Sequence, residues 1–203
     1  MISCKFRIYG KPVQGCPLWH IPPHYFQLPR FPHNPYENAK LFAVVRNPFD
    51  RLISEFFYAR HYGSLKNSTL TVNRLNAWVR FFMIRAKEAT KGDIANNITG
   101  NHKYFLNAGH FIPQYDFVFD GDKRVIHHVL KFEQLHDDFH ELMALYNLNL
   151  TLPSKKENHV RNVTKTMSAK DLTPDLIELI EEVYANDFRE FGYTLLSSAN
   201  KSQ

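Results

Sequence analysis

Apolar and polar residues follow one another along the chain in a pattern that predicts a strand followed by a helix. Residues 41–45 form a short continuous apolar run, which is typical of a strand that is buried on both faces of a sheet. Residues 48–61 carry apolar side chains at helical spacing, so they predict a helix with one face against that sheet. The positions that form this stripe are Phe49, Leu52, Ile53, Phe56 and Phe57.

Later segments repeat the pattern. Apolar positions within 75–86 and 135–146 predict two more amphipathic helices, and Thr173-Pro174 opens a last one. Residues 115–120 and 125–132 are strand-like and are joined by a turn with the sequence Asp-Gly-Asp-Lys. Strands that alternate with helices predict an α/β fold, a parallel sheet flanked by helices, in a single domain. Loops are expected at residues 1–37, 63–71, 91–109 and 153–166.

The composition predicts a globular protein, and its net charge favours an anionic partner. Its 203 residues are 44% hydrophobic and 14% aromatic, which is enough for a substantial core. The net charge of +5 favours a sulfonucleotide, an acidic glycan or a nucleic acid. The charge is spread along the chain instead of forming a basic arm, which argues against nucleic acid. The sequence contains no stretch of about 18 apolar residues that would predict a membrane span, and its first residues lack the apolar region of a signal peptide.

Cysteines and glycosylation sequons bear on the compartment. Cys4 and Cys16 could form a disulfide or remain free thiols, and the sequence leaves both possibilities open. The pattern Asn-x-Ser/Thr occurs more often than chance would supply, which favours the lumen of the secretory pathway. It begins at Asn67, Asn97, Asn149, Asn162 and Asn200.

Polar residues around the first strand and helix could hold a phosphate group. Asn47 can cap the helix and Pro48 suits its first position. Arg46 lies at the carboxyl end of the strand, where open α/β sheets bind ligands. Arg51 and Ser54 are three residues apart, so they can share one face of the helix. Local chemistry alone leaves two interpretations open, a phosphate site and an ordinary solvated helix.

The run from Arg46 to Ser54, Arg-Asn-Pro-Phe-Asp-Arg-Leu-Ile-Ser, closely resembles the 3′-phosphate-binding segment of PAPS-dependent sulfotransferases. Further segments resemble the carbohydrate (Golgi-type) sulfotransferases, in the same order as in that family. They are His110-Phe-Ile-Pro-Gln114 leading into Tyr115-Asp-Phe-Val-Phe119, Val129-Leu-Lys-Phe-Glu-Gln-Leu135 with Asp138-Phe139, and Tyr184-Ala-Asn-Asp-Phe-Arg-Glu-Phe-Gly-Tyr193. The likeness covers roughly residues 17–195 and implies the P-loop-NTPase-like sulfotransferase fold.

The resemblance implies a reaction and a set of residues. PAPS would donate a sulfuryl group to a carbohydrate hydroxyl group and leave as PAP, without a metal ion. Arg46 and Ser54, with Arg51, match the residues that bind the 3′-phosphate. A guanidinium can donate two parallel hydrogen bonds to a phosphate group, which the ammonium group of Lys cannot do. Another segment resembles the part of the family that closes over the nucleotide, although a solvated basic loop explains it almost as well. Its candidate contacts are Arg161, Thr164 and Lys165.

The reaction needs a base near the sulfuryl group. In related glycan sulfotransferases with a histidine base, that histidine precedes the arginine strand by about two dozen residues, and here His20 and His24 occupy that window. We favour His20 because Trp19 and the two following prolines would define its loop. His110 is expected to shape the acceptor side or to cap a strand. Ordinary surface histidines are the alternative.

One family element has no counterpart in the sequence. The loop that binds the 5′-phosphosulfate is a Lys-x-Gly-[Ser/Thr]-x-Ser-like turn before a helix, and Gly10-Lys11-Pro12 does not replace it because Pro removes a backbone donor. We expect a fragment of a longer protein, a type II membrane protein of the Golgi, that carries the first strand and this loop. The alternative is a non-catalytic homologue that binds PAP, PAPS or an anionic glycan. A kinase P-loop motif is absent from the sequence.

Overall fold

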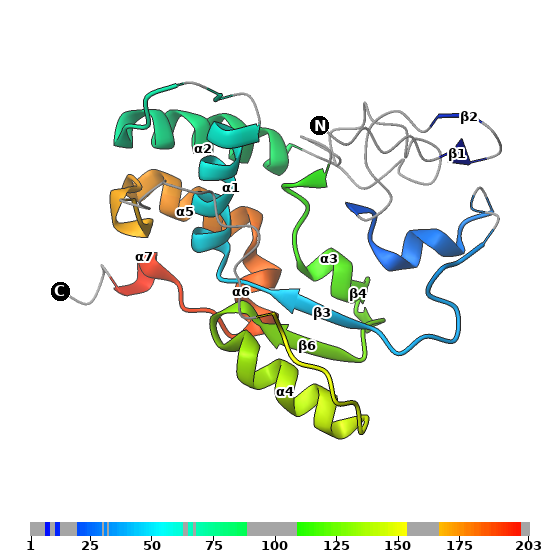
Figure 1. Cartoon of the computed structure of the whole chain (residues 1–203). Helices are drawn as coiled ribbons and strands as arrows, with labels where there is room; N and C mark the ends of the chain where they lie inside the picture. Colours follow the sequence, from blue (N-terminus) through cyan, green and yellow to red (C-terminus); the bar gives the residue numbers. More distant parts are fainter. Residues whose placement is uncertain are drawn as a thin grey trace.

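The protein combines a small parallel sheet with surrounding helices, as the computed structural model in Figure 1 shows. The structure describes residues 7–8, 11–12, 20–29, 31, 33–62, 65–66, 68–88, 109–153 and 167–199. Both cysteines, four of the five sequons and most of the predicted loop 91–109 lie outside these residues.

The central sheet pairs two strands from distant parts of the chain. Strand β3 (Phe42–Val45) runs parallel to β6 (His128–Lys131), and the register places Val45 beside Lys131. This pair confirms the predicted parallel arrangement. Short antiparallel pairs also occur among the described residues, β1 (Arg7–Ile8) with β2 (Lys11–Pro12) and β4 (Phe119–Asp120) with β5 (Lys123–Arg124).

The four predicted helices are confirmed as α1 (Pro48–Tyr62), α2 (Val72–Lys87), α4 (Leu135–Leu145) and α5 (Pro174–Val183). Local caps account for where two of them begin. The Asn47 side chain accepts the Phe49 N–H at 2.9 Å, and the Thr71 side chain accepts the Arg74 N–H at 3.2 Å. The shorter helices are η2 (Pro23–Gln27), α3 (Tyr115–Val118), η4 (Phe132–Gln134), η5 (Ala169–Asp171), α6 (Ala185–Phe191) and α7 (Leu196–Ala199).

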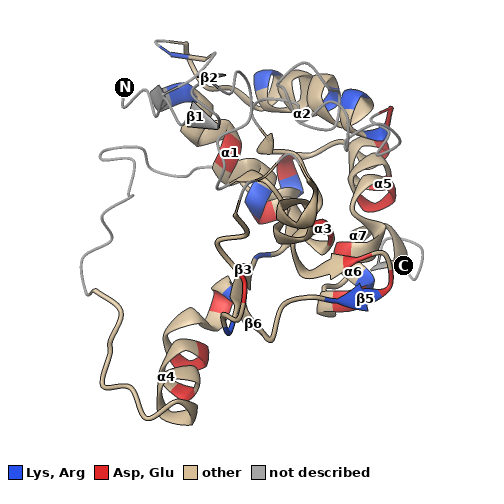
Figure 2. Ribbon diagram, turned by 90° about the vertical axis from the view of Figure 1, so that its right-hand side faces the viewer, with Lys and Arg blue, Asp and Glu red and all other residues tan. Residues whose placement is uncertain are grey.

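The main core lies where α1, α2 and α5 pack together. The apolar stripe predicted for α1 is buried there, with Leu75 and Met83 of α2 and Leu176 of α5. Figure 2 shows Lys and Arg on α2 and Asp and Glu on α5, and ion pairs of 2.6 and 2.7 Å join these two helices, Arg80 to Asp175 and Lys87 to Glu182. No helix in the described part of the chain is both long and apolar enough to cross a membrane.

Strand β3 is not buried on both faces, which corrects the expectation from its apolar run. Val45 is buried on one face, whereas Phe42 and Val44 on the other are 48% and 42% exposed. Helix α4 packs over β6 and buries Leu130, but it covers β3 only partly. The alternation is therefore that of a half-covered strand.

Residues 115–118 form the short helix α3 instead of the predicted strand. The buried carboxylate of Asp187 accepts the backbone N–H groups of Gln114 and Tyr115, at 3.0 and 2.7 Å, and thereby satisfies the first turn of the helix. Tyr115 then stacks on Phe119 four residues later. The predicted turn that follows is confirmed, and Gly121 adopts a φ of 58° in it.

Candidate functional site

Arg46 lies at the carboxyl edge of the parallel sheet, directly after β3. Lys131 ends β6 at the same edge, because it is the register partner of Val45. The guanidinium carbon of Arg46 lies 4.6 Å from the centre of the Phe132 ring, within the range of a cation–π contact. The sheet thus brings two cationic residues from strands far apart in sequence to one edge.

One side chain binds both hydrogen-bonding groups of the Arg46 backbone. The Arg46 N–H donates to Gln114 Oε1 at 2.8 Å, and Gln114 Nε2 donates to the Arg46 carbonyl oxygen at 2.8 Å. These are the two hydrogen bonds that a neighbouring strand would supply. The position of Arg46 at the edge therefore depends on Gln114 and does not require its own side chain.

Asp187 in turn holds Gln114. Its carboxylate is fully buried and accepts from Gln114 Nε2 at 3.1 Å, in addition to the two backbone N–H groups at the start of α3. Burial raises the pKa of the Asp187 carboxyl, and the nearby Arg51 cation and these N–H donors oppose that rise. The carboxylate on α6 is thus coupled to the strand end through a single glutamine.

Glu133 makes a second link at the same edge. Its carboxylate accepts the Asn47 N–H at 2.7 Å and the Tyr193 hydroxyl at 3.1 Å, while the Lys131 N–H donates to Asp138 at 2.6 Å. Burial and the Glu133 charge both raise the pKa of the Tyr193 phenol above its ordinary value, which favours the protonated hydroxyl that donates to Glu133. All of the family-like sequence segments therefore meet in one hydrogen-bond network around the end of β3.

Arg51 and Ser54 project from α1 just beyond that network. Arg51 Nη2 donates to the carbonyl oxygens of His110 and Ile112, each at 2.9 Å, and its guanidinium carbon lies 5.8 Å from the Tyr184 ring centre. Arg51 therefore anchors the loop before α3. Ser54 is half-buried on the next turn of the helix. Contact of either residue with a phosphate stays a prediction.

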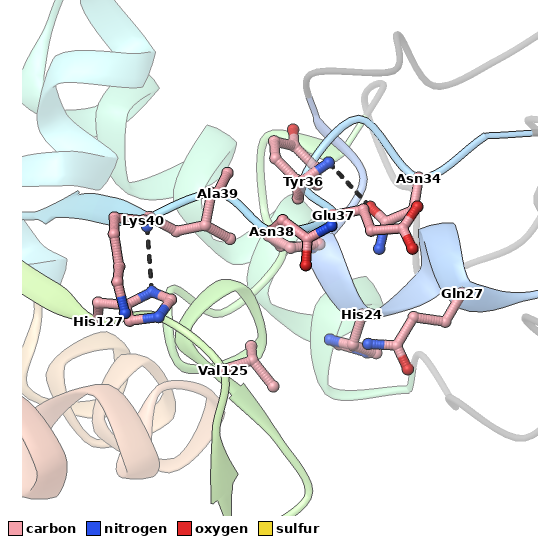
Figure 3. Close-up of a pocket in the computed structure, with 12 residues that line it drawn as sticks. His24, Gln27, Asn34, Tyr36, Glu37, Asn38, Ala39, Lys40, Val125 and His127 are labelled. Carbon is pink, nitrogen blue, oxygen red and sulfur yellow. Dashed lines mark hydrogen bonds between the residues drawn. The ribbon is translucent and has the colours of Figure 1, made fainter.

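The two candidate histidines lie in different surroundings. The His20 ring stands perpendicular to the His110 ring with 4.6 Å between their centres, and His110 Nδ1 lies 2.7 Å from Glu55 Oε1 on α1. His24 lines a cavity of about 510 Å³ at the amino end of β3, which Figure 3 shows with His127 on its other side. His20 is thus associated with α1, whereas His24 faces this separate cavity.

Sequence reasoning assigned no role to four residues that organise the site, Glu55, Gln114, Glu133 and Asp187. Three of them occur in the sequence as parts of family-like segments, and Glu55 carried a signal of its own, since it lies four residues after Arg51 and off the apolar stripe. Three of the predicted nucleotide contacts, Arg161, Thr164 and Lys165, lie outside the residues that the structure describes. Within the described ranges, no group of three or more His, Cys, Asp or Glu side chains is arranged to hold a metal ion.

Comparison with known proteins agrees with this geometry. The family model described as "Sulfotransferase family" matches residues 24–194, a range that includes the strand end, α1 and the segments around Gln114, Glu133 and Asp187. Neither the curated proteins nor the solved structures that were compared contain a match. Because the family model matches most of the chain, the protein belongs to the sulfotransferase family.

Proposed function

We propose that the protein transfers a sulfuryl group from PAPS to a hydroxyl group of a carbohydrate. Family membership accounts for sulfuryl transfer in general, and the donor and acceptor are the further steps of the proposal. The observation that carries it is Arg46, a cation at the carboxyl edge of a parallel sheet, with its backbone N–H and carbonyl oxygen both bound by the Gln114 amide. A cation fixed there is suited to a phosphate group.

In this proposal Arg46 and Ser54 bind the 3′-phosphate of PAPS. A guanidinium can donate two parallel N–H groups to phosphate oxygens, and a serine hydroxyl can donate a third hydrogen bond. Arg51 supports them from the same helix, and Arg161, Thr164 and Lys165 are the further proposed contacts of the nucleotide. Gln114 holds the backbone of Arg46 and the Phe132 ring contacts its guanidinium, so fewer orientations of the charged group are lost when the ligand binds, which lowers the entropy cost of binding.

We assign His20 as the base and the reaction as an in-line displacement. His20 accepts the proton of the acceptor hydroxyl group, the hydroxyl oxygen forms a bond to sulfur, and the bond between sulfur and the 5′-phosphate oxygen of PAPS breaks. The electron pair of that bond leaves with PAP. His24 is the second candidate base, although its cavity lies at the amino end of β3 and Arg46 follows the carboxyl end.

The proposed compartment is the lumen of the Golgi. Asn149, which begins a sequon after α4, is exposed and so accessible to glycosylation. The proposed partner is a glycan or glycoconjugate acceptor.

Calorimetric titration of PAP tests the phosphate site directly. Arg46→Ala is a clean perturbation because the hydrogen bonds to Gln114 use only the backbone of Arg46, so the fold should lose little more than the contact with Phe132. A charge-assisted bidentate contact is worth about 1.5–3 kcal/mol, so PAP affinity should fall by roughly 10- to 100-fold. Arg46→Lys should recover only part of it, because Lys cannot donate in a bidentate way.

The matched control is Arg85→Ala, which removes the same charge from an exposed residue that contacts Phe81 on its own helix α2, away from the end of β3. It should bind PAP like the wild type. Equal affinity of wild type and Arg46→Ala would refute the assignment of the phosphate site. Specific binding of PAP without sulfate transfer to any acceptor, in a form that carries the 5′-phosphosulfate loop, would favour the non-catalytic homologue.

A further inference from the structure

We propose that Glu55 and His110 position His20 and stabilise the positive charge that it acquires when it takes a proton. The three residues would form one carboxylate–imidazole–imidazole cluster, in which Glu55 and His110 are positioning residues. This inference rests on the proposed function, because that proposal assigns His20 as the base.

The first step is the contact between Glu55 and His110. His110 Nδ1 lies 2.7 Å from Glu55 Oε1, and the two side chains are only 22% and 17% exposed. With Glu55 as a carboxylate, which can only accept hydrogen bonds, the proposal places the proton of this contact on His110 Nδ1. A carboxylate on one imidazole nitrogen sets the tautomer and ring orientation, as the acidic member of catalytic triads does.

The second step is the support of the His110 backbone. The carbonyl oxygens of three consecutive residues in this loop accept hydrogen bonds from side chains that are buried or half-buried. Arg51 donates to the carbonyl oxygens of His110 and Ile112, and the Tyr184 hydroxyl donates to that of Phe111 at 3.2 Å. The residue before them, Gly109, has a φ of 90°, which residues with a Cβ rarely adopt. His110 is therefore held by its main chain and its side chain together.

Helix α1 supplies both kinds of support. Arg51 binds the carbonyl of His110, and Glu55, one turn later, binds its ring. Ser54, the proposed phosphate ligand, directly precedes Glu55 in the sequence. Binding of the donor and orientation of the base would thus depend on one turn of one helix.

The third step is the contact between the two imidazole rings. Their centres are 4.6 Å apart and the rings are perpendicular, so His110 limits the orientations open to His20. In the part of the chain that the structure describes, the ionisable and charged groups in contact with His110 include Glu55 and Tyr58 of α1, His20, and the Arg51 guanidinium at its carbonyl oxygen. Glu55 supplies the carboxylate in this group.

The chemical consequence concerns the charge on His20. When His20 accepts the acceptor's hydroxyl proton it becomes an imidazolium ion, and the Glu55 carboxylate on the far side of His110 attracts that charge. Because the side chains are partly shielded from water, the attraction is screened less than it would be at the surface. The carboxylate therefore favours the protonated base that the transfer step produces.

Histidine titration by NMR in the full 203-residue chain tests this coupling without requiring turnover. The chain is compared with Glu55→Gln, with His110→Phe, which keeps a ring against His20, and with the control Glu141→Gln on the exposed side of α4. The titration midpoint of His20 should move to lower pH by on the order of half a pH unit or more in Glu55→Gln and stay unchanged in the control. Nitrogen shifts of wild-type His110 should show a proton on Nδ1.

Turnover gives the second readout. In an active form, Glu55→Gln should lower kcat by about 10- to 100-fold and shift the pH profile, while the Kd for PAP stays unchanged. An unchanged His20 midpoint in Glu55→Gln would overturn the inference, as would an unchanged kcat and pH profile. A shifted His20 midpoint together with no PAP binding, in a form that carries the 5′-phosphosulfate loop, would support the coupling and reject the proposed function, so the two failures are distinguishable.

Discussion

Replacing Gln114, the residue that binds the Arg46 backbone, with glutamate tests whether its hydrogen bonds stabilise the site. Gln114→Glu changes one NH2 group to an oxygen and keeps the shape of the side chain. The Arg46 N–H can still donate to the remaining oxygen, but the two bonds that Nε2 donates, to the Arg46 carbonyl and to Asp187, are lost. The new oxygen of the introduced glutamate then faces the Arg46 carbonyl oxygen and an oxygen of the buried Asp187 carboxylate, with no hydrogen between them.

The cost follows from these contacts. A neutral hydrogen bond contributes about 1 kcal/mol and one to a charged group about 1.5–3 kcal/mol, before any repulsion is counted. The new carboxyl can avoid the repulsion by binding a proton, which costs at most about 4 kcal/mol at pH 7 for a group with an ordinary pKa near 4.3. We therefore expect Gln114→Glu to lower the free energy of unfolding by roughly 3–4 kcal/mol at pH 7.

The pH dependence of this loss is the signature. In the folded variant the pKa of the introduced carboxyl group would lie above its unfolded value, so the protonated form is favoured in the folded state and stability is lost as pH rises through the folded pKa. At pH 5 protonation costs only about 1 kcal/mol, and the variant should recover roughly 2 kcal/mol or more relative to wild type.

Urea denaturation followed by circular dichroism at pH 5 and pH 7 measures both quantities. Gln134→Glu makes the same chemical change at an exposed position before α4 and should be close to neutral at both pH values. A loss below about 1 kcal/mol at pH 7, or an equal loss at the two pH values, would refute the reasoning about Gln114.

Two further predictions concern the acid stability and the identity of the base. Arg80 lowers the pKa of Asp175 to about 2 from its ordinary 3.8, so this pair stabilises the fold above pH 4 and the contribution disappears as pH falls toward 2. Asp175→Asn should therefore flatten the dependence of the melting temperature on pH between about 4 and 2, and an unchanged dependence would contradict this prediction. In an active form, His20→Ala should lower kcat by about 10²- to 10⁴-fold, whereas His24→Ala should affect KM more than kcat because His24 lines the separate cavity. Loss of kcat in His24→Ala with His20→Ala active would make His24 the base.

Local signals predicted most of the secondary structure. The apolar spacing of α1, its Asn-Pro start and the Thr-Pro start of α5 act within one or two turns, so they can be read without knowledge of the fold. The apolar run of β3 predicted a strand correctly but not its environment, because the extent to which α4 covers Phe42 and Val44 depends on where that helix packs.

The segment 115–118 shows the opposite case. Its alternation of apolar and polar residues is compatible with a strand, and the short helix exists because Asp187, 72 residues away from Tyr115, accepts the N–H groups at its start. A tertiary contact thus overrode the local pattern. No inspection of residues 115–118 alone could have found it.

Capping, spacing and short motifs depend on neighbouring residues, so the amino-acid order alone was enough to predict the helices, the strand that ends at Arg46 and the family-like segments. How those segments meet depends on tertiary packing. It joined Gln114 to Arg46, Asp187 to Gln114 and Glu55 to His110, contacts that span 55 to 73 residues. Contacts of this kind follow from how buried faces pack, since a buried polar group needs a partner wherever the fold places one.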